Sequence, residues 1–109
     1  MDKFCGSYSF LLIKMMKDVG LYEAAIFAEL LNRHEIFFQE KRLEDSWFYM
    51  TADELEDRTG IKKKKQDSCI DTLINLGFIQ KKVEGYPLRR WIKFNEMKCR
   101  ELGLNDFKK

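Results

Sequence analysis

The stretch TGIKKKKQDSCIDTLINLGFI, residues 59–79, holds the signals that decide the fold of this chain. Gly60 stands where a preceding helix would end in a left-handed residue, and four lysines follow at residues 62–65. Apolar residues then recur at spacings of three and four up to Gly77. The stretch therefore predicts a helix over about residues 62–76 that follows a tight turn and begins with an entirely cationic turn.

This predicted helix has an apolar side and a polar side. We expect its core-facing residues to be Cys69, Ile70, Leu73, Ile74 and Leu76. The opposite side holds mostly polar residues, namely Lys63, Lys64, Asp67, Ser68 and Asp71. A helix that follows another helix through a short turn, with its basic end exposed, has the geometry that places side chains in the DNA major groove.

The residues before the turn predict another helix and a strand. Thr51 and Glu54 have the spacing of a capping box, which predicts a short helix over about Ala52–Arg58. The aromatic run Trp47–Met50 favours a strand. The polar segment Gln39–Ser46 is expected to form a loop.

A longer helix is predicted further upstream, over Leu21–Phe38, where apolar residues again follow the helical period. His34 lies on or beside its apolar stripe, so a histidine at the edge of the core is expected rather than a metal ligand. The segment Phe10–Val19 is compatible with a short helix or with an extended segment.

Downstream of the lysine-rich helix the sequence predicts a β-hairpin and one more helix. Two strands are expected at Ile79–Val83 and Leu88–Phe94, around a turn at residues 84–87 that contains glycine and proline. Asn95 is suited to cap a last helix over Glu96–Leu102.

The composition narrows the classes of protein. A chain of 109 residues that is 45% hydrophobic and 14% aromatic can form one domain with a modest core. No apolar run is long enough to cross a membrane, and the apolar N-terminal stretch is interrupted by Lys14 and Lys17, so we expect no signal peptide. Cys5, Cys69 and Cys99 lack the spacing of metal ligands, so we expect no disulfides, no metal and no cofactor. Free cysteines also favour a cytoplasmic location.

Charge is divided unevenly along the chain. Residues 1–57 contain 6 basic and 12 acidic side chains, whereas residues 58–109 contain 14 basic and 6 acidic ones. Because affinity for a polyanion follows local neutralisation of phosphates, this segregation favours a nucleic-acid partner more strongly than the net charge of +2 does. A charged, solvated surface is the alternative explanation.

A group of short motifs resembles a known family. The motifs are Trp47-Phe48-Tyr49-x-Thr51, Leu55, Thr59-Gly60-Ile61, Gln66, Leu73-x-x-Leu76-Gly77-Phe78-Ile79, and Gly85-x-Pro87 with Arg89-Arg90. Together they resemble small winged helix-turn-helix domains of bacterial mobile elements, the N-terminal domains of phage replisome-organiser and plasmid replication-initiator proteins. The resemblance covers about residues 21–98. It implies an α+β, mainly α fold with a three-helix core, a β-hairpin wing, a short third strand and an extra C-terminal helix.

That resemblance also implies a division of the chain. Residues 1–20 would form a lead-in, residues 21–98 the DNA-binding domain, and residues 99–109 the end of the last helix and a tail. The chain would be either the excised first domain of a longer replication protein or a small regulator that acts alone.

The resemblance implies that double-stranded DNA is bound by the first turns of the lysine-rich helix and by the hairpin. The candidate contacts are Lys62, Lys63, Lys64, Lys65, Gln66, Asp67, Lys82, Tyr86, Arg89 and Arg90. We expect Lys63, Lys64 and either Gln66 or Asp67 at base edges. Lys62 and Lys65 are expected at phosphates.

The hairpin contacts and two departures from the family pattern limit this prediction. Basic side chains alternate between the two faces of the hairpin, so about half of them should face nucleic acid. Tyr86 either contacts the DNA backbone or minor groove, or shields the hairpin. Lys62 replaces the serine or threonine that often begins such helices. Asp67 and Asp71 place negative charge on the face expected to meet DNA.

Other functions remain open at the level of sequence. A protein-interaction or dimerisation module without significant DNA binding is the main alternative, with the acidic N-terminal half as a partner surface. Replication and transcription control need the same module, and a homodimer or a regulatory protein partner is compatible with both. We expect no enzymatic activity, because the chain has no glycine-rich phosphate loop and its single histidine leaves no nucleophile and base pair.

Overall fold

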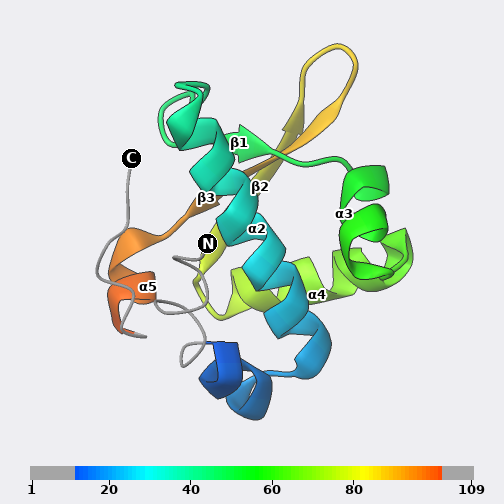
Figure 1. Ribbon diagram of the computed structural model, residues 1–109, viewed down its shortest axis with the longest axis vertical. Coiled ribbons are helices and arrows are strands. Elements are labelled where there is room, and N and C mark those ends of the chain that lie inside the picture. The colour runs from blue at the N-terminus through cyan, green and yellow to red at the C-terminus, as the bar shows by residue number, and fades with distance from the viewer. Residues whose placement is uncertain (1–11, 102–109) are drawn as a thin grey trace.

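The computed structural model describes residues 12–101. Its elements follow in the order α2 (Leu21–Gln39), β1 (Phe48–Tyr49), α3 (Ala52–Thr59), α4 (Lys63–Asn75), β2 (Ile79–Glu84), β3 (Arg89–Phe94) and α5 (Glu96–Glu101). A short helical segment at residues 12–18 precedes α2, which resolves the open choice in favour of a helix there. The described part of the chain is an α+β domain, mainly helical, with a three-stranded antiparallel sheet (Figure 1).

Local sequence signals explain where α3 begins. The Glu54 backbone N–H donates to the Thr51 hydroxyl at 3.1 Å, and the Thr51 backbone N–H donates to the Glu54 carboxylate at 3.0 Å. This reciprocal pair is the predicted capping box, and it satisfies two N–H groups that the helix itself leaves without partners.

The turn between α3 and α4 is formed as the sequence predicts. Gly60 has a φ of 77°, a left-handed conformation that is costly for residues with a Cβ atom. The Thr59 hydroxyl donates to the Leu55 carbonyl at 2.7 Å and accepts from the Ile61 N–H at 3.1 Å. These bonds connect the end of α3 to the chain that leads into α4.

Helix α4 buries three of the five predicted core residues completely, Cys69, Ile70 and Leu73, and Ile74 partly. The prediction for Leu76 is wrong, because this side chain is 42% exposed. The helix ends at Asn75, so Leu76 lies at its C-cap, and Gly77 then adopts a φ of 88°, which turns the chain toward β2.

The sheet has the strand order β1-β3-β2, with Phe48 opposite Ile92 and Ile79 opposite Phe94. Strands β2 and β3 form the predicted hairpin, in which β3 begins at Arg89, one residue later than predicted. Figure 1 shows α2 lying across the sheet and the hairpin turn projecting beyond the helices. Helix α5 follows at once, and Asn95 caps it by accepting from the Lys98 N–H at 3.3 Å. Its predicted last residue, Leu102, lies outside the described residues.

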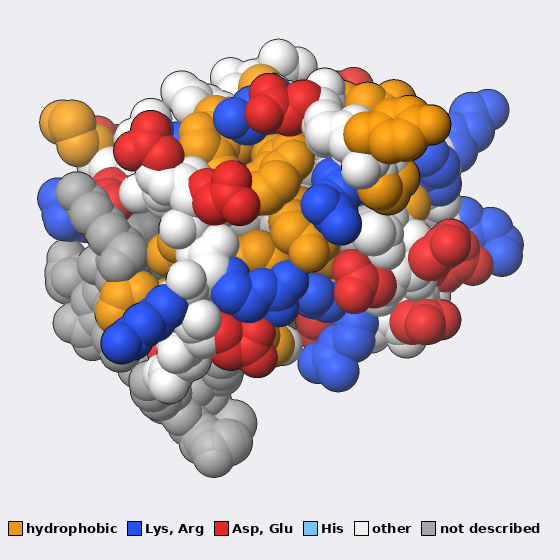
Figure 2. Space-filling view, turned by 90° about the horizontal axis from the view of Figure 1, so that it is seen from above, with side chains coloured by type: hydrophobic (Ala, Val, Ile, Leu, Met, Phe, Trp, Pro, Cys, Tyr) orange, Lys and Arg blue, Asp and Glu red, His pale blue; other side chains and the backbone are white. Residues whose placement is uncertain are grey.

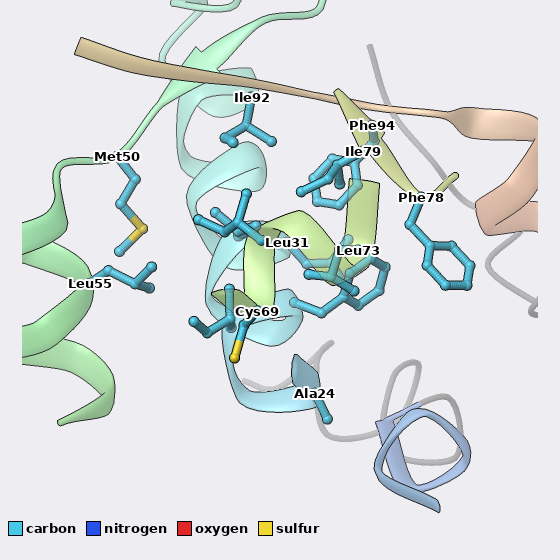
Figure 3. Close-up of a cluster of buried hydrophobic side chains, with 14 of the residues drawn as sticks. Ala24, Leu31, Met50, Leu55, Cys69, Leu73, Phe78, Ile79, Ile92 and Phe94 are labelled. Atoms are coloured by element: carbon cyan, nitrogen blue, oxygen red, sulfur yellow. The ribbon is translucent and has the colours of Figure 1, made fainter. Parts of the chain in front are cut away.

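The core lies where α2, α4 and the sheet meet. Figure 3 shows Leu31, Leu73 and Ile79, one from each of these layers, gathered in one buried cluster. At one end Phe48 and Phe94 stack with ring centres 5.6 Å apart, and His34 lies edge-on to both rings. His34 is therefore buried within the core rather than at its edge, where the sequence predicts it. None of the helices formed by residues 12–101 combines the length and apolar content needed to cross a membrane.

Candidate nucleic-acid interface

A groove separates the start of α4 from the hairpin. It has a volume of about 490 Å³ and is lined by Thr51, Ala52, Lys63, Asp67, Asp71, Lys81, Val83, Leu88, Arg89 and Arg90. Three elements build it: the start of α3 at one end, α4 along one side, and the inner face of the hairpin along the other. Four of the predicted contacts, Lys63, Asp67, Arg89 and Arg90, come together here from positions up to 27 residues apart.

The four lysines before and within the first turn of α4 differ in their surroundings. Lys62 forms an ion pair with Glu56 at 3.2 Å, and Lys63 forms one with Asp67 at 3.0 Å. The Lys65 ammonium lies 4.9 Å from the centre of the Tyr22 ring. Lys64 is exposed and makes no hydrogen bond or ion pair with the residues that the structure describes. Lys64 therefore has the ammonium group most available to a ligand.

Gln66 is not available to a ligand, so its predicted contact with a base edge is wrong. Its side chain is fully buried, and its amide donates to the carbonyl oxygens of Ala52 at 3.0 Å and Ile61 at 2.8 Å. The sequence did carry the signal for this position. Gln66 lies three and four residues before the buried Cys69 and Ile70, and thus on the core side of the helix.

Arg90 is also engaged inside the protein. Its guanidinium donates to Asp67 at 3.1 Å and to the Gln66 carbonyl at 2.9 Å, and its side chain is only 11% exposed. Burial lowers the pKa of Arg90, although the charge of Asp67 works against that shift. In this conformation Arg90 supports the groove from beneath, and its predicted role as a direct DNA contact is not supported.

The Asp67 carboxylate forms ion pairs with Lys63 of α4 and Arg90 of β3. Partial burial opposes ionisation, but the hydrogen bond and charge of Lys63, together with the charges of Arg90 and Lys81, outweigh it and hold the pKa of Asp67 below its usual value. Asp67 is thus ionised at neutral pH, and it neutralises part of the positive charge at the start of α4.

The other basic side chains of the hairpin divide between its two faces, as the alternation predicts. Lys81 lies on the inner face, 3.9 Å from Asp71 of α4. Lys82 lies on the outer face with its ammonium 4.4 Å from the centre of the Trp47 ring. Arg89 lines one end of the groove, but its guanidinium is turned to that same outer face, 4.6 Å from the Tyr49 ring centre. These cation–π contacts hold both outer cations against the sheet.

What the hairpin tip exposes is largely apolar. Tyr86 is completely exposed, and Leu88 and Val83 are 71% and 57% exposed. Val83 and Leu88 are absent from the predicted contacts, because the pattern of charge in the sequence points only to the basic residues. In the view from above, Figure 2 shows hydrophobic, basic and acidic side chains interspersed, with neither charge forming one continuous area.

The outward side of α4 adds residues that are absent from the predicted contacts. Ser68, Asp71 and Asn75 are exposed on it and continue the line that starts at Lys64. Starting from Lys64, these residues follow one another at intervals of four, three and four residues, and this helical spacing is the signal that could have identified them.

Metal chemistry finds no support in the described residues, which contain no group of three histidine, cysteine or carboxylate side chains able to hold an ion. Comparison with protein-family models, with curated protein sequences and with solved structures finds no match for this chain.

Proposed function

We propose that this protein binds double-stranded DNA as a winged helix-turn-helix domain, with the start of α4 in the major groove and the hairpin as the wing. The observation that carries the proposal is the pairing of α3 and α4 through the left-handed Gly60 turn. Lys64 is exposed in the first turn of α4, and the hairpin lies across a groove from it. Two helices joined in this way, the second with a basic, exposed start, suit insertion into the major groove.

The charges point to binding dominated by phosphate contacts. Lysine is a flexible point charge, better suited to phosphates than to reading bases. Asp67 and Asp71 on the same side of α4 limit how much negative charge this surface attracts. We therefore propose modest affinity with few base-specific contacts, in the setting of a replication or transcription regulator of a bacterial mobile element.

Fluorescence anisotropy with a labelled random-sequence duplex, between about 50 and 200 mM salt, tests the proposal. The wild-type protein is expected to bind at low salt. Lys64→Ala should weaken binding and reduce the slope of log K against log salt by about 0.9, the value for one lost phosphate contact. Lys17→Ala, which removes an exposed lysine of the 12–18 segment, is the matched control and should leave the slope unchanged. Equal slopes for all three proteins would refute the role of α4.

A protein-interaction module is the second candidate function, and the exposed apolar tip of the hairpin favours it. The exposed side chains of Tyr86, Leu88 and Val83 suit contact with another protein better than contact with phosphates, because they carry no positive charge. A folded protein that fails to bind the duplex even at low salt would support this second function over the first.

A further inference from the structure

Three side chains join the hairpin to α4 beneath the groove. Arg90 of β3 bonds both Asp67 and Gln66 of α4, at 3.1 and 2.9 Å. The Gln66 amide in turn donates to the carbonyl oxygens of Ala52, at the start of α3, and Ile61, in the turn before α4. One network therefore connects β3, α4, α3 and the turn.

Burial makes this network strong. Gln66 is fully buried and the Arg90 side chain is only 11% exposed. Removing one partner from a buried hydrogen bond costs free energy, because water cannot replace the lost partner. The ion pair between Lys81 and Asp71, which also links the hairpin to α4, spans 3.9 Å with Asp71 mostly exposed. An exposed pair of this length contributes little. The Arg90 network is thus the stronger of these two polar connections.

We propose that Gln66 and Arg90 are positioning residues that hold the hairpin at a set distance from α4, so that both bind DNA as one preformed surface. The consequence for DNA binding rests on the proposed function; the coupling of hairpin and helix does not. A preformed groove avoids the free-energy cost of ordering the hairpin when the ligand binds.

Hydrogen exchange of the free protein tests the coupling without DNA. In Arg90→Met, which keeps an unbranched apolar side chain but removes the guanidinium, the amides of residues 82–84 and 89–91 should exchange about tenfold faster. The amides of residues 79–80 and 93–94, at the base of the hairpin, should change little. Arg89→Met is the matched control, since Arg89 is the neighbouring residue on the outer face, and it should leave the exchange of residues 82–84 near that of the wild type.

The alternative to a positioning role is a general contribution to stability. Acceleration spread evenly over α2, α4 and the sheet would overturn the proposal, as would equal exchange in Arg90→Met and Arg89→Met. If Arg90→Met does not fold, Arg90→Lys serves in its place. A single ammonium cannot bond Asp67 and Gln66 with the geometry of the guanidinium fork, so a smaller acceleration confined to the hairpin is expected.

Duplex binding by the same variants tests the functional consequence. Arg90→Met should weaken binding more than Arg89→Met and flatten the salt dependence, although both variants remove one positive charge, and Arg90→Lys should restore part of the loss. Binding by Arg90→Met equal to that of the wild type would refute the role in DNA binding. A wild-type protein that binds no duplex would refute the proposed function, while the exchange measurement would still decide the coupling.

Discussion

The Lys63 ammonium lies 3.0 Å from the Asp67 carboxylate, one turn further along α4. Arg90 approaches the other oxygen of the same carboxylate at 3.1 Å. A cation that sequence alone assigns to DNA is thus held by an acid of its own helix. The strength of the proposed DNA contact depends on the balance between these charges, and a change to Asp67 exposes that balance.

Asp67→Asn should raise affinity for duplex DNA by about three- to tenfold at low salt and steepen the salt dependence by about 0.9. The substitution removes a negative charge from the groove and frees Lys63, while the amide oxygen can still accept from Arg90. Asp18→Asn is the matched control, because Asp18 pairs with Lys14 at the same helical spacing, at 3.2 Å. The measurement is anisotropy across a salt series, and weaker binding by Asp67→Asn would contradict this account of the groove.

Thr51→Ala should lower the free energy of unfolding by about 1 kcal/mol, because it removes the hydroxyl that accepts from the Glu54 N–H. Thr51→Ser keeps the hydroxyl and should stay close to the wild type. Urea denaturation of the three proteins measures the difference. An equal loss for both variants would show that the methyl group, and not the capping bond, matters at this position.

Leu73→Ala should lower the free energy of unfolding by about 2–5 kcal/mol, because Leu73 is fully buried between α2 and the sheet. Leu76→Ala, three residues later, should change it by no more than about 0.5 kcal/mol, since that side chain is largely exposed. The same chemical change is made in both, so thermal or urea unfolding compares burial alone. Similar losses at the two positions would contradict the exposed position of Leu76.

The stability of the protein should fall as the pH drops below about 6.5. Burial lowers the pKa of His34, and the nearby charges of Glu35 and Glu96 only partly oppose this. The unfolded chain therefore takes up a proton at a higher pH than the folded protein does. The stabilisation is complete above the unfolded pKa and is lost as the pH falls toward the folded value.

Urea denaturation at about pH 7.5 and about pH 5.5 measures this loss, with His34→Gln as the comparison. At the higher pH, His34→Gln should be less stable than the wild type. Between the two pH values, its free energy of unfolding should fall by less than that of the wild type. A wild-type protein that is equally stable at both values, or a variant with the same pH dependence, would show that His34 does not carry the effect.

Local patterns in the sequence were reliable where the physical cause is local. The capping box at Thr51, the left-handed Gly60 and the hairpin each depend on neighbours within a few residues, and each is present, although the hairpin turn lies at residues 85–88, one residue later than the predicted 84–87. Helical spacing also identified the buried side of α4, except at Leu76. There the end of the helix, which periodicity does not show, decided the outcome.

The candidate site was less predictable, because its side chains are engaged by distant segments. The resemblance predicts a DNA contact for Gln66, although its bonds to Ala52 and Ile61 place it in the core. Arg90 was assigned for its charge, although a residue 23 positions earlier in the chain neutralises it. Both predictions treat a polar side chain as free, because its partner is not visible in the sequence.

From residue 21 onward, the order of helices and strands, the turn before α4 and the basic character of the C-terminal half follow from the amino-acid sequence alone. Those properties follow from backbone geometry and residue spacing, which act over a few residues. Which cations remain available to a ligand depends on how the folded elements pack. Ion pairs and cation–π contacts form between elements that folding brings together, as Lys65 meets Tyr22 and Arg90 meets Asp67. Of the four lysines that define the opening stretch, packing left Lys64 the one without such a contact among the described residues.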